Sequence, residues 1–301
     1  MKNKFFRSPL FYVGDKYKLV PEIKALFPDN IRQFVEPFVG GGSVFMNVEA
    51  ETFLLNDIDS NVISIHKMLC ERSCDKNSFF EYIDSVIKRY NLSCSYRCDV
   101  IPEQLKRENV KTFYARFNKA GYEKMRLDYN QSKKKNTELL YLLLIYGFNR
   151  MLRFNKSNNF NLPVGNVDFN KNTEIALIDY FDIVQKKKPL WYNMDFEEFL
   201  NSIELTNEDF IYLDPPYLIT FSEYNKLWNV DVEQRLLDLL DVLNDRGIRF
   251  AISNVTHYRE RQNDKFIEWA NNYEIHSIKS NYISYHDNSI KKFNEVLVTN
   301  Y

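Results

Sequence analysis

The chain has 301 residues, a formal net charge of -1, and a composition that is 45% hydrophobic and 16% aromatic. This length suits one sizeable α/β domain with a smaller insertion, and the apolar content excludes global disorder. The longest apolar run, residues 139–146, is far shorter than the roughly 20 residues needed to span a bilayer. The N-terminus lacks an apolar stretch adequate for a signal peptide, so we expect a cytoplasmic protein.

Short apolar strands alternate with helical patterns at both ends of the chain. The expected strands are residues 34–38, 53–55, 210–213 and 249–253. An amphipathic helix is expected at residues 231–245, ending at Gly247, and residues 273–279 and 296–301 are expected to form an antiparallel hairpin. This alternation predicts an α/β fold with a Rossmann-like, doubly wound and mostly parallel sheet.

A glycine-rich turn follows the first expected strand. Gly40, Gly41 and Gly42 let the backbone take positive φ and approach a ligand closely, and the helical pattern after them offers free N–H groups. The spacing matches neither a phosphate loop nor the G-x-G-x-x-G dinucleotide motif. The second strand ends in Asp57, at a place where Rossmann-like sheets use an acid to bind ribose hydroxyls. The turn and this acid together predict a ligand site at the ends of these strands.

The middle third of the chain has a helical, basic and aromatic pattern. Residues 88–156 contain 16 Lys and Arg against 6 Asp and Glu, although the whole chain is nearly neutral. Such an asymmetry marks a surface that meets a phosphate backbone, although an ordinary solvated face can carry the same charges. We predict one domain made of residues 1–60 and 190–301, with residues 61–189 as an inserted, mainly helical domain.

The most informative motif, Asp214-Pro-Pro-Tyr217, closes the third expected strand. Prolines stop strand pairing and hold their own carbonyls in a rigid turn. A carboxylate and a fixed carbonyl accept two hydrogen bonds, and the tyrosine offers a flat face for stacking. The set therefore suits a planar base with an exocyclic amino group. A strand that ends in a Pro-Pro turn with a hydrogen-bonded aspartate is the purely structural alternative.

Four cysteines, Cys70, Cys74, Cys94 and Cys98, form two C-x₃-C pairs. In a cytosolic chain such cysteines are expected to be reduced thiols. A Cys₄ zinc site stays open as an alternative, although the gap in such sites is more often two residues. We expect no metal cofactor.

Taken together, these segments resemble the Dam-type DNA adenine-N6 methyltransferases, which use S-adenosylmethionine. The similar segments follow the family order along nearly the whole chain and are Ser8–Val20, Val35–Ser43, Leu55–Asp59, Tyr146–Asn155, Phe160–Gly165, Asp214–Tyr217, Phe250–Asn254 and Glu295–Tyr301. Several matches in order are more specific than any one of them. One residue departs from the pattern, because Asp15 stands where the family usually has a second glycine before the lysine.

The resemblance implies that residues 1–60 and 190–301 form the catalytic domain, which binds S-adenosylmethionine as the cofactor, and that residues 61–189 form the target-recognition domain. The cofactor-binding positions in this chain are Tyr12, Lys16, Glu36, Phe38, Gly40, Asp57 and Asp214. Among these, Lys16 is expected to pair with the methionine carboxylate, and Asp57 to bind the ribose hydroxyls.

The resemblance also gives the residues Asp214, Pro215, Pro216 and Tyr217 a catalytic role. The Asp214 carboxylate and the Pro215 carbonyl are expected to accept the two N6–H bonds of adenine, and Tyr217 to stack on the base after it leaves the helix. Methyl transfer from a sulfonium needs no metal and no covalent enzyme intermediate, so the protein supplies position and electrostatics. Asp214 then orients the amine more than it acts as a general base.

For contacts with double-stranded DNA, the resemblance points to the segment after Gly147. The expected contact residues are Phe148, Asn149, Met151, Arg153 and Pro163. Arg153 falls where the family places an arginine on guanine, and the bidentate arginine–guanine pair is the commonest specific base contact. Phe148 stands where relatives often insert an aromatic ring into the space left by the flipped base. Because Asn149 and Arg153 keep their family identity, we expect GATC as the target.

Other functions share several of these features. N4-cytosine and protein-glutamine methyltransferases share the fold, but they usually carry Ser or Asn at the position of Asp214. An RNA adenine methyltransferase would act on RNA in place of duplex DNA, and a non-catalytic DNA-binding regulator would bind without methyl transfer. A cognate restriction endonuclease in the same system is a compatible partner with no direct contact implied, and no membrane partner is expected.

Overall fold

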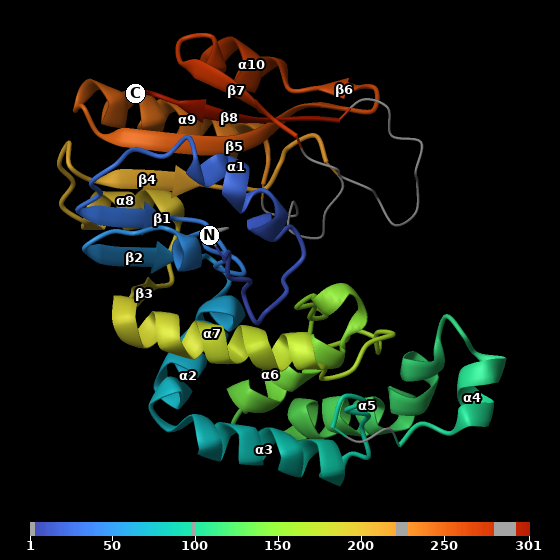
Figure 1. Cartoon of the computed structure of the whole chain (residues 1–301). Coiled ribbons are helices and arrows are strands. Elements are labelled where there is room, and N and C mark those ends of the chain that lie inside the picture. Colours follow the sequence, from blue (N-terminus) through green and yellow to red (C-terminus); the bar gives the residue numbers. More distant parts are fainter. Residues whose placement is uncertain (1–3, 98–99, 221–227, 280–292) are drawn as a thin grey trace. The chain divides into compact units, whose positions relative to one another are not determined.

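The computed structural model describes residues 4–97, 100–220, 228–279 and 293–301 (Figure 1). Contacts between residues divide the chain into two compact units. The helical unit consists of Met1–Tyr17, Gly40–Met46 and Asp59–Lys188, and the sheet unit consists of Lys18–Val39, Asn47–Ile58 and Pro189–Tyr301. The catalytic and recognition roles expected for two domains stay predictions, because contacts define compactness and not activity.

Within the described residues, the sheet unit contains one eight-stranded sheet. Its strands are β1 (Gln33–Glu36), β2 (Thr52–Asn56), β3 (Leu190–Tyr192), β4 (Phe210–Leu213), β5 (Arg249–Tyr258), β6 (Arg261–Gln262), β7 (Glu274–Ile278) and β8 (Phe293–Thr299). The strand order is β3-β2-β1-β4-β5-β8-β7, and β6 pairs with β5. The pairs among β1 to β5 are parallel, whereas β8 is antiparallel to both β5 and β7. This topology confirms the predicted α/β class, the mostly parallel sheet and the C-terminal antiparallel pair.

Each of the four expected strands corresponds to a strand of the sheet, with shifts at the ends. β4 is buried along its whole length, as a continuous apolar run between two parallel neighbours requires. β1 ends at Glu36 rather than Phe38, because Pro37 follows and has no N–H to donate. β5 continues past Ser253 because β8 pairs along its length. β3 was not expected, since its three residues are exposed or only partly buried and form no long apolar run.

The sheet unit also contains four of the described α-helices. They are α1 (Val20–Lys24), α8 (Phe196–Ser202), α9 (Val230–Asp245) and α10 (Asp264–Ala270). The predicted helix at 231–245 is confirmed as α9: the Asn229 side chain accepts hydrogen bonds from two N–H groups of its first turn, and Gly247 follows its end at a φ of 71°. The buried face of α9, including Leu236 and Leu240, packs in the core cluster that also holds Ile211 of β4.

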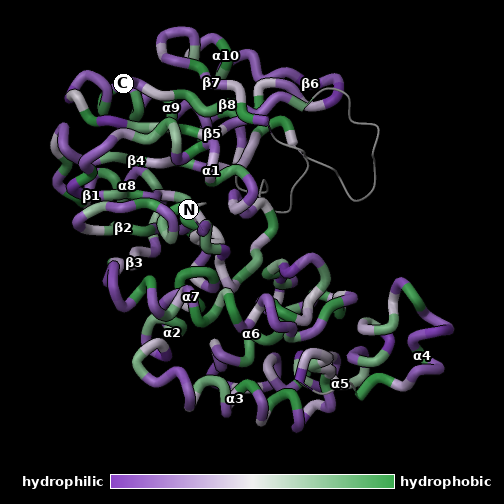
Figure 2. The backbone as a smooth tube through the Cα atoms, viewed as in Figure 1, coloured by the Kyte–Doolittle hydropathy of each residue, from purple (hydrophilic) through white to green (hydrophobic). Residues whose placement is uncertain are grey.

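The helical unit consists mainly of helices, as the pattern of the middle third predicts. They are α2 (Ser60–Arg72), α3 (Lys76–Arg89), α4 (Glu103–Glu108), α5 (Phe113–Gln131), α6 (Thr137–Tyr146) and α7 (Lys171–Lys187). All residues of α6 from Leu139 to Tyr146 are buried, so the longest apolar run forms a core helix. Figure 2 shows hydrophobic residues along α6 and mostly hydrophilic ones on α4, none of whose residues is buried. Among the described residues, no helix is both long enough and apolar enough to cross a membrane.

Candidate functional site

The carboxyl end of β4 carries the motif that begins with Asp214. Asp214 and Pro216 are partly buried, and Pro215 is buried. The Tyr217 hydroxyl lies 2.9 Å from Oδ1 of Asp214 and 3.0 Å from Oε1 of Glu295. Burial, reinforced by these two carboxylates, raises the pKa of the Tyr217 phenol well above its ordinary value, so the hydroxyl is a proton donor at neutral pH.

The predicted acids of the sheet unit gather at one edge of the sheet. Glu36 ends β1 and is buried, with a relative exposure of 2%, and Asp57 follows β2 directly. β1 is parallel to β2 and to β4, with Glu36 opposite Leu55 and Val35 opposite Ile211. The carboxyl ends of these strands, and with them Glu36, Asp57 and Asp214, therefore share one edge. Ligands of open α/β sheets bind outside this edge.

Phe38, another predicted cofactor residue, lies two residues beyond β1 and belongs to an aromatic cluster of the sheet unit. Its ring meets the Trp228 ring edge-on at a centroid distance of 5.6 Å and the Phe196 ring at 5.5 Å. Trp228 precedes α9 and is buried. Phe38 is therefore held in place by the sequence that leads into α9, and its own ring is only partly buried.

The glycine turn lies in the helical unit and takes the backbone conformations that its sequence predicts. Gly40 has a φ of 46° and Gly42 a φ of 79°, both in the left-handed region that glycine accepts without strain. The Gly40 carbonyl accepts a hydrogen bond of 2.9 Å from Nε2 of His66, and Nδ1 of His66 accepts one of 2.8 Å from the Tyr180 hydroxyl. The carbonyl offers no proton, which fixes this tautomer. Complete burial lowers the pKa of His66 to about 4.

His66 was not predicted as part of the site. Its place on α2, within an apolar helical pattern, gives no sequence signal that it reaches the glycine turn. Because it is buried and neutral, it positions the turn through hydrogen bonds rather than through charge. The glycine turn also packs closely against Tyr12, because a Cβ on Gly41 would lie 3.0 Å from Cβ of Tyr12.

The N-terminal segment brings Tyr12 and Lys16 into the helical unit, both largely buried with a relative exposure of 9%. The Lys16 ammonium donates to the Gly14 carbonyl at 3.5 Å. Asp15, the departure from the family pattern, accepts a hydrogen bond of 3.1 Å from the Tyr17 N–H, and burial raises the pKa of its carboxyl. Asp15 thus stabilises the local turn through its side chain, where a glycine could not.

The predicted DNA contacts lie on one loop of the helical unit, residues 147–165, which we call the recognition loop. Isolated bridges join Gly147 to Val164 and Phe154 to Phe160, so the two sides of the loop run antiparallel. The Phe148 N–H donates to the Pro163 carbonyl at 2.9 Å. The structure thereby brings two predicted contact residues together.

The side chains of the recognition loop divide into exposed and anchored groups. Phe148 has a relative exposure of 40%, Asn149 and Pro163 are exposed, and Met151 is partly buried. Arg153 is anchored, because its Nε donates to Oδ1 of Asn161 at 3.0 Å and its Nη2 donates to the Asn161 carbonyl at 2.8 Å. An exposed aromatic ring and an anchored arginine on one loop fit a surface that meets bases.

Arg150 occupies the loop position at which φ is 49°, next to Asn149 with a φ of 52°. Its guanidinium lies 4.1 Å from the centroid of the Phe11 ring, a cation–π contact. Desolvation lowers the pKa of Arg150 to about 10. The recognition loop is thus held against the N-terminal segment that carries Tyr12.

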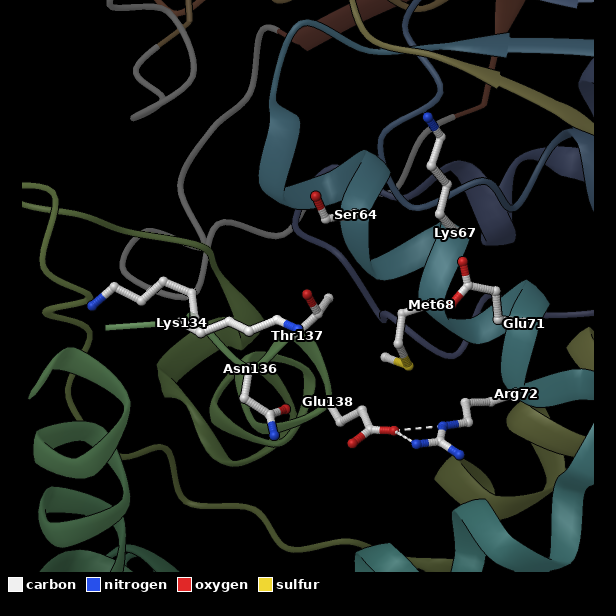
Figure 3. A pocket seen from close by; sticks show the side chains of 10 residues that line it. Ser64, Lys67, Met68, Glu71, Arg72, Lys134, Asn136, Thr137 and Glu138 are labelled. Carbon is white, nitrogen blue, oxygen red and sulfur yellow. Dashed lines mark hydrogen bonds and ion pairs between the residues drawn. The ribbon is translucent and has the colours of Figure 1, made fainter. Parts of the chain in front are cut away.

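A separate groove of about 680 Å³ lies in the helical unit (Figure 3). Its lining residues are Ser64, Lys67, Met68, Glu71, Arg72, Lys134, Lys135, Asn136, Thr137 and Glu138. Arg72 and Glu138 form an ion pair within it. The groove contains none of the predicted site residues, so its size does not make it the reaction site.

The cysteines give no metal site among the residues that the structure describes. Cys70 is partly buried, Cys74 is exposed and Cys94 is buried, and no group of three or more metal-binding side chains occurs in the described part of the chain. Cys98 lies outside the described residues.

Acids at the carboxyl ends of adjacent parallel strands are typical of Rossmann-like sheets that bind a nucleoside-containing ligand. A family model described as D12 class N6 adenine-specific DNA methyltransferase matches residues 12–283. The chain therefore belongs to the D12 class of N6 adenine-specific DNA methyltransferases, which confirms the resemblance found in its motifs.

Three relatives illustrate the range of this family. The chain is 34% identical over 308 residues to the Type II methyltransferase M.FokI of Planomicrobium okeanokoites, covering 99% of this chain and 43% of the relative. It is 34% identical over 312 residues to the modification methylase StsI of Streptococcus sanguinis, with the same coverage of 99% and 43%. It is 30% identical over 264 residues to the DNA adenine methylase of Vibrio cholerae, covering 84% of this chain and 83% of the relative. The chain thus spans less than half the length of the first two relatives.

Proposed function

We propose that this chain is an enzyme that transfers a methyl group from S-adenosylmethionine to N6 of adenine in duplex DNA. The observation that carries the proposal is the motif Asp214-Pro-Pro-Tyr217 at the carboxyl end of buried β4, in a chain of the D12 class. The motif supplies a carboxylate, a fixed carbonyl and an aromatic ring within four residues. These groups fit the two N6–H donors and the flat face of an adenine.

S-adenosylmethionine supplies an electrophilic methyl group on a sulfonium. The residues proposed to hold it are Tyr12, Lys16, Glu36, Phe38, Gly40, Asp57 and Asp214. Two features support the fit: the chain packs tightly at the glycine turn, where a Cβ on Gly41 would lie 3.0 Å from Cβ of Tyr12, and the acids of β1 and β2 end at one edge of the sheet. Lys16 is proposed for the methionine carboxylate and Asp57 for the ribose hydroxyls.

At the base, Asp214 and the Pro215 carbonyl are proposed to accept the two N6–H bonds. Both acceptors polarise the amine and direct its lone pair away from the ring, which makes N6 a better nucleophile. The Tyr217 ring is proposed to stack on the base, and Pro216 keeps the turn rigid because its φ is fixed. The base must leave the duplex first, since a stacked and paired N6 cannot reach the methyl group.

The recognition loop is proposed to read the DNA, with residues 61–189 as the recognition domain and 1–60 with 190–301 as the catalytic domain. Arg153 is proposed to contact a guanine, and Phe148 to fill the space left by the flipped base. The proposed target is GATC. A cognate restriction endonuclease is a proposed functional partner, because two relatives are named as a Type II methyltransferase and a modification methylase.

The deciding experiment measures methyl transfer from labelled S-adenosylmethionine to duplex DNA with one GATC site, to the same duplex with that site scrambled, and to matching RNA. Sequencing of the product maps the methylated adenine. Asp214→Ala should abolish transfer, whereas Asp238→Ala, the same change at an exposed position of α9, should not.

Each outcome of this experiment has a distinct meaning. Methylation confined to GATC supports the reaction and the target together. Methylation at another sequence keeps the enzyme and rejects GATC. Transfer to RNA alone identifies an RNA adenine methyltransferase, and DNA binding without any transfer identifies a non-catalytic regulator.

A further inference from the structure

Three side-chain oxygens form a row at the end of β4. The Tyr217 hydroxyl stands in the middle, 2.9 Å from Oδ1 of Asp214 and 3.0 Å from Oε1 of Glu295. Glu295 lies 78 residues further along the chain, on β8. The three residues meet because β8 pairs with β5 and β5 pairs with β4.

Glu295 is unusual for its place in the sheet. It begins the buried part of β8, before Val296 and Leu297, and its relative exposure is 3%. Burial of a carboxyl group is unfavourable unless hydrogen bonds compensate for it. Among the described contacts, the Tyr217 hydroxyl supplies such a bond. A strand position that packing alone would fill with an apolar residue thus holds an acid that faces the site.

The ring of Tyr217 is also fixed from the side. It packs against the buried cluster of Ile219, Val255 and Tyr258. Val255 is the β5 residue opposite Glu295 in the strand register. The ring and the hydroxyl are therefore both held by the β5–β8 pair, which leaves Tyr217 little freedom to rotate.

We propose that Glu295 is a positioning residue for methyl transfer, which orients the Asp214 carboxylate and the Tyr217 ring through the Tyr217 hydroxyl. This role rests on the proposed function of Asp214 and Tyr217. A carboxylate has two oxygens and about four lone-pair positions. When the hydroxyl holds Oδ1, the carboxylate plane is set, and the remaining positions take a fixed direction towards the amine. The hydroxyl has one proton, which Asp214 and Glu295 share, so Glu295 keeps the hydroxyl on the line between the two carboxylates.

Loss of Glu295 should act on the chemical step and not on binding. Without Glu295, the hydroxyl proton points wholly to Oδ1 of Asp214, and the orientation that the shared proton gave to the Asp214 carboxylate is lost. Misplacement of a reacting group by about 1 Å can reduce the rate about 100-fold. The single-turnover methylation rate should therefore fall about 10- to 100-fold in Glu295→Leu, while the KM for DNA and the Kd for S-adenosylmethionine stay within about twofold of wild type.

The test is a double-mutant cycle on the full chain. Tyr217→Phe keeps the ring and removes the hydroxyl, so it should slow the single-turnover rate by a similar factor. If Glu295 acts through that hydroxyl, Tyr217→Phe with Glu295→Leu should be no slower than Tyr217→Phe alone. Glu295→Gln can still donate an N–H to the hydroxyl oxygen, so it should restore the rate to within about fivefold of wild type.

Two variants keep this test decisive. If Glu295→Leu does not fold, Glu295→Asp replaces it in the cycle, because the shorter acid stays buried but cannot reach the hydroxyl. Asp264→Leu, at an exposed position of α10, serves as a control for the change of acid to leucine.

The outcomes separate this inference from the proposed function. The inference would be overturned if the rate effects of Tyr217→Phe and Glu295→Leu multiply in the double variant. It would also be overturned if Glu295→Leu raises KM while kcat is unchanged. Either result would leave the proposed methyltransferase function standing. A wild-type chain that methylates no nucleic acid would reject the proposed function, and the inference with it.

Discussion

The two ends of β4 carry the same amino acid in two different settings. Asp209, just before the strand, is completely buried, and its carboxylate accepts hydrogen bonds from the side chain or backbone of Arg32, Gln33 and Thr206. Asp214, just after the strand, is only partly buried, and its Oδ1 accepts a hydrogen bond of 2.9 Å from the Tyr217 hydroxyl. The first aspartate ties chain segments together, and the second is oriented by another residue of the motif.

Residue type alone does not separate a structural acid from one proposed to act on the substrate. Both aspartates flank the same apolar run, and both lie next to prolines or turn residues in the sequence. The number and origin of the hydrogen-bond donors distinguish them. Asp209 accepts hydrogen bonds from the N–H groups of Gln33 on β1 and of Thr206 in the turn before β4. Asp214 instead contacts the hydroxyl of Tyr217, a residue of its own motif that also contacts Glu295.

Asp209→Ala should produce the largest loss of stability. It leaves the Arg32 guanidinium and two N–H groups without their acceptor, which costs about 3–5 kcal/mol for a fully buried pair. Because Arg32 is partly exposed, the free energy of unfolding should fall by about 3 kcal/mol. Urea unfolding followed by circular dichroism measures this. A loss below about 1 kcal/mol, the range of ordinary surface substitutions, would mean that the hydrogen bonds of Asp209 do not hold these chain segments together.

Asp214→Asn, at the other end of β4, should slow methyl transfer strongly but change stability little. The amide has the same shape, but its NH₂ group cannot accept a bond from the adenine amine. The single-turnover methylation rate should fall about 10²–10³-fold, as for other preorganised polar groups in active sites. The free energy of unfolding should stay within about 1 kcal/mol of wild type, because Asp214 is only partly buried. A stability loss as large as that of Asp209→Ala would show that Asp214 is a structural residue like Asp209.

His66 extends the comparison to a buried group of the helical unit, because it resembles Asp209 in serving structure. Its pKa of about 4 in the folded chain lies below the ordinary value of 6.5, so the unfolded chain binds the proton first as pH falls. The contribution of His66 to stability is therefore complete above pH 6.5 and is lost as pH falls towards 4. By pH 5 the loss should reach about 2 kcal/mol. Urea unfolding at several pH values measures it, and His66→Gln should remove that part of the pH dependence.

Arg153→Ala should have the smallest effect, because Arg153 resembles Asp214 in being anchored yet partly exposed. Loss of a bidentate base contact reduces discrimination by about 1–3 kcal/mol. The ratio of kcat/KM between the target duplex and a duplex with one changed guanine should therefore shrink by about 10- to 100-fold. Arg246→Ala, at an exposed position after α9, is the matched control. Equal losses on both duplexes would show that Arg153 contacts the DNA backbone instead.

The sequence predicts the parts of the molecule whose signals are local. Residues 210–213 form β4 as expected, because an apolar run followed by two prolines has few other solutions. The positions of Asp214 and of the glycine turn follow from the same kind of pattern. The family found in the motifs is confirmed across residues 12–283.

The parts that could not be predicted depend on partners far away in the sequence. Glu295 directly precedes the expected strand at residues 296–301 and begins a segment similar to the family, and only the pairing of β8 with β5 brings it to Tyr217. His66 looks like a core residue of a helix until its bonds to Gly40 and Tyr180 are known, the latter 114 residues away. A buried charge in an apolar strand is the one signal that could have marked Glu295 in advance.

The helical unit is assembled from three stretches of chain, residues 1–17, 40–46 and 59–188. The stretches depend on one another: the Tyr141 hydroxyl donates to the Pro9 carbonyl, and Arg150 lies over Phe11. Residues 59–188 therefore do not form a portable cassette. A chimaera that exchanged only this stretch between relatives would separate Tyr141 and Arg150 from their partners, so an exchange of the helical unit must include the N-terminal segment.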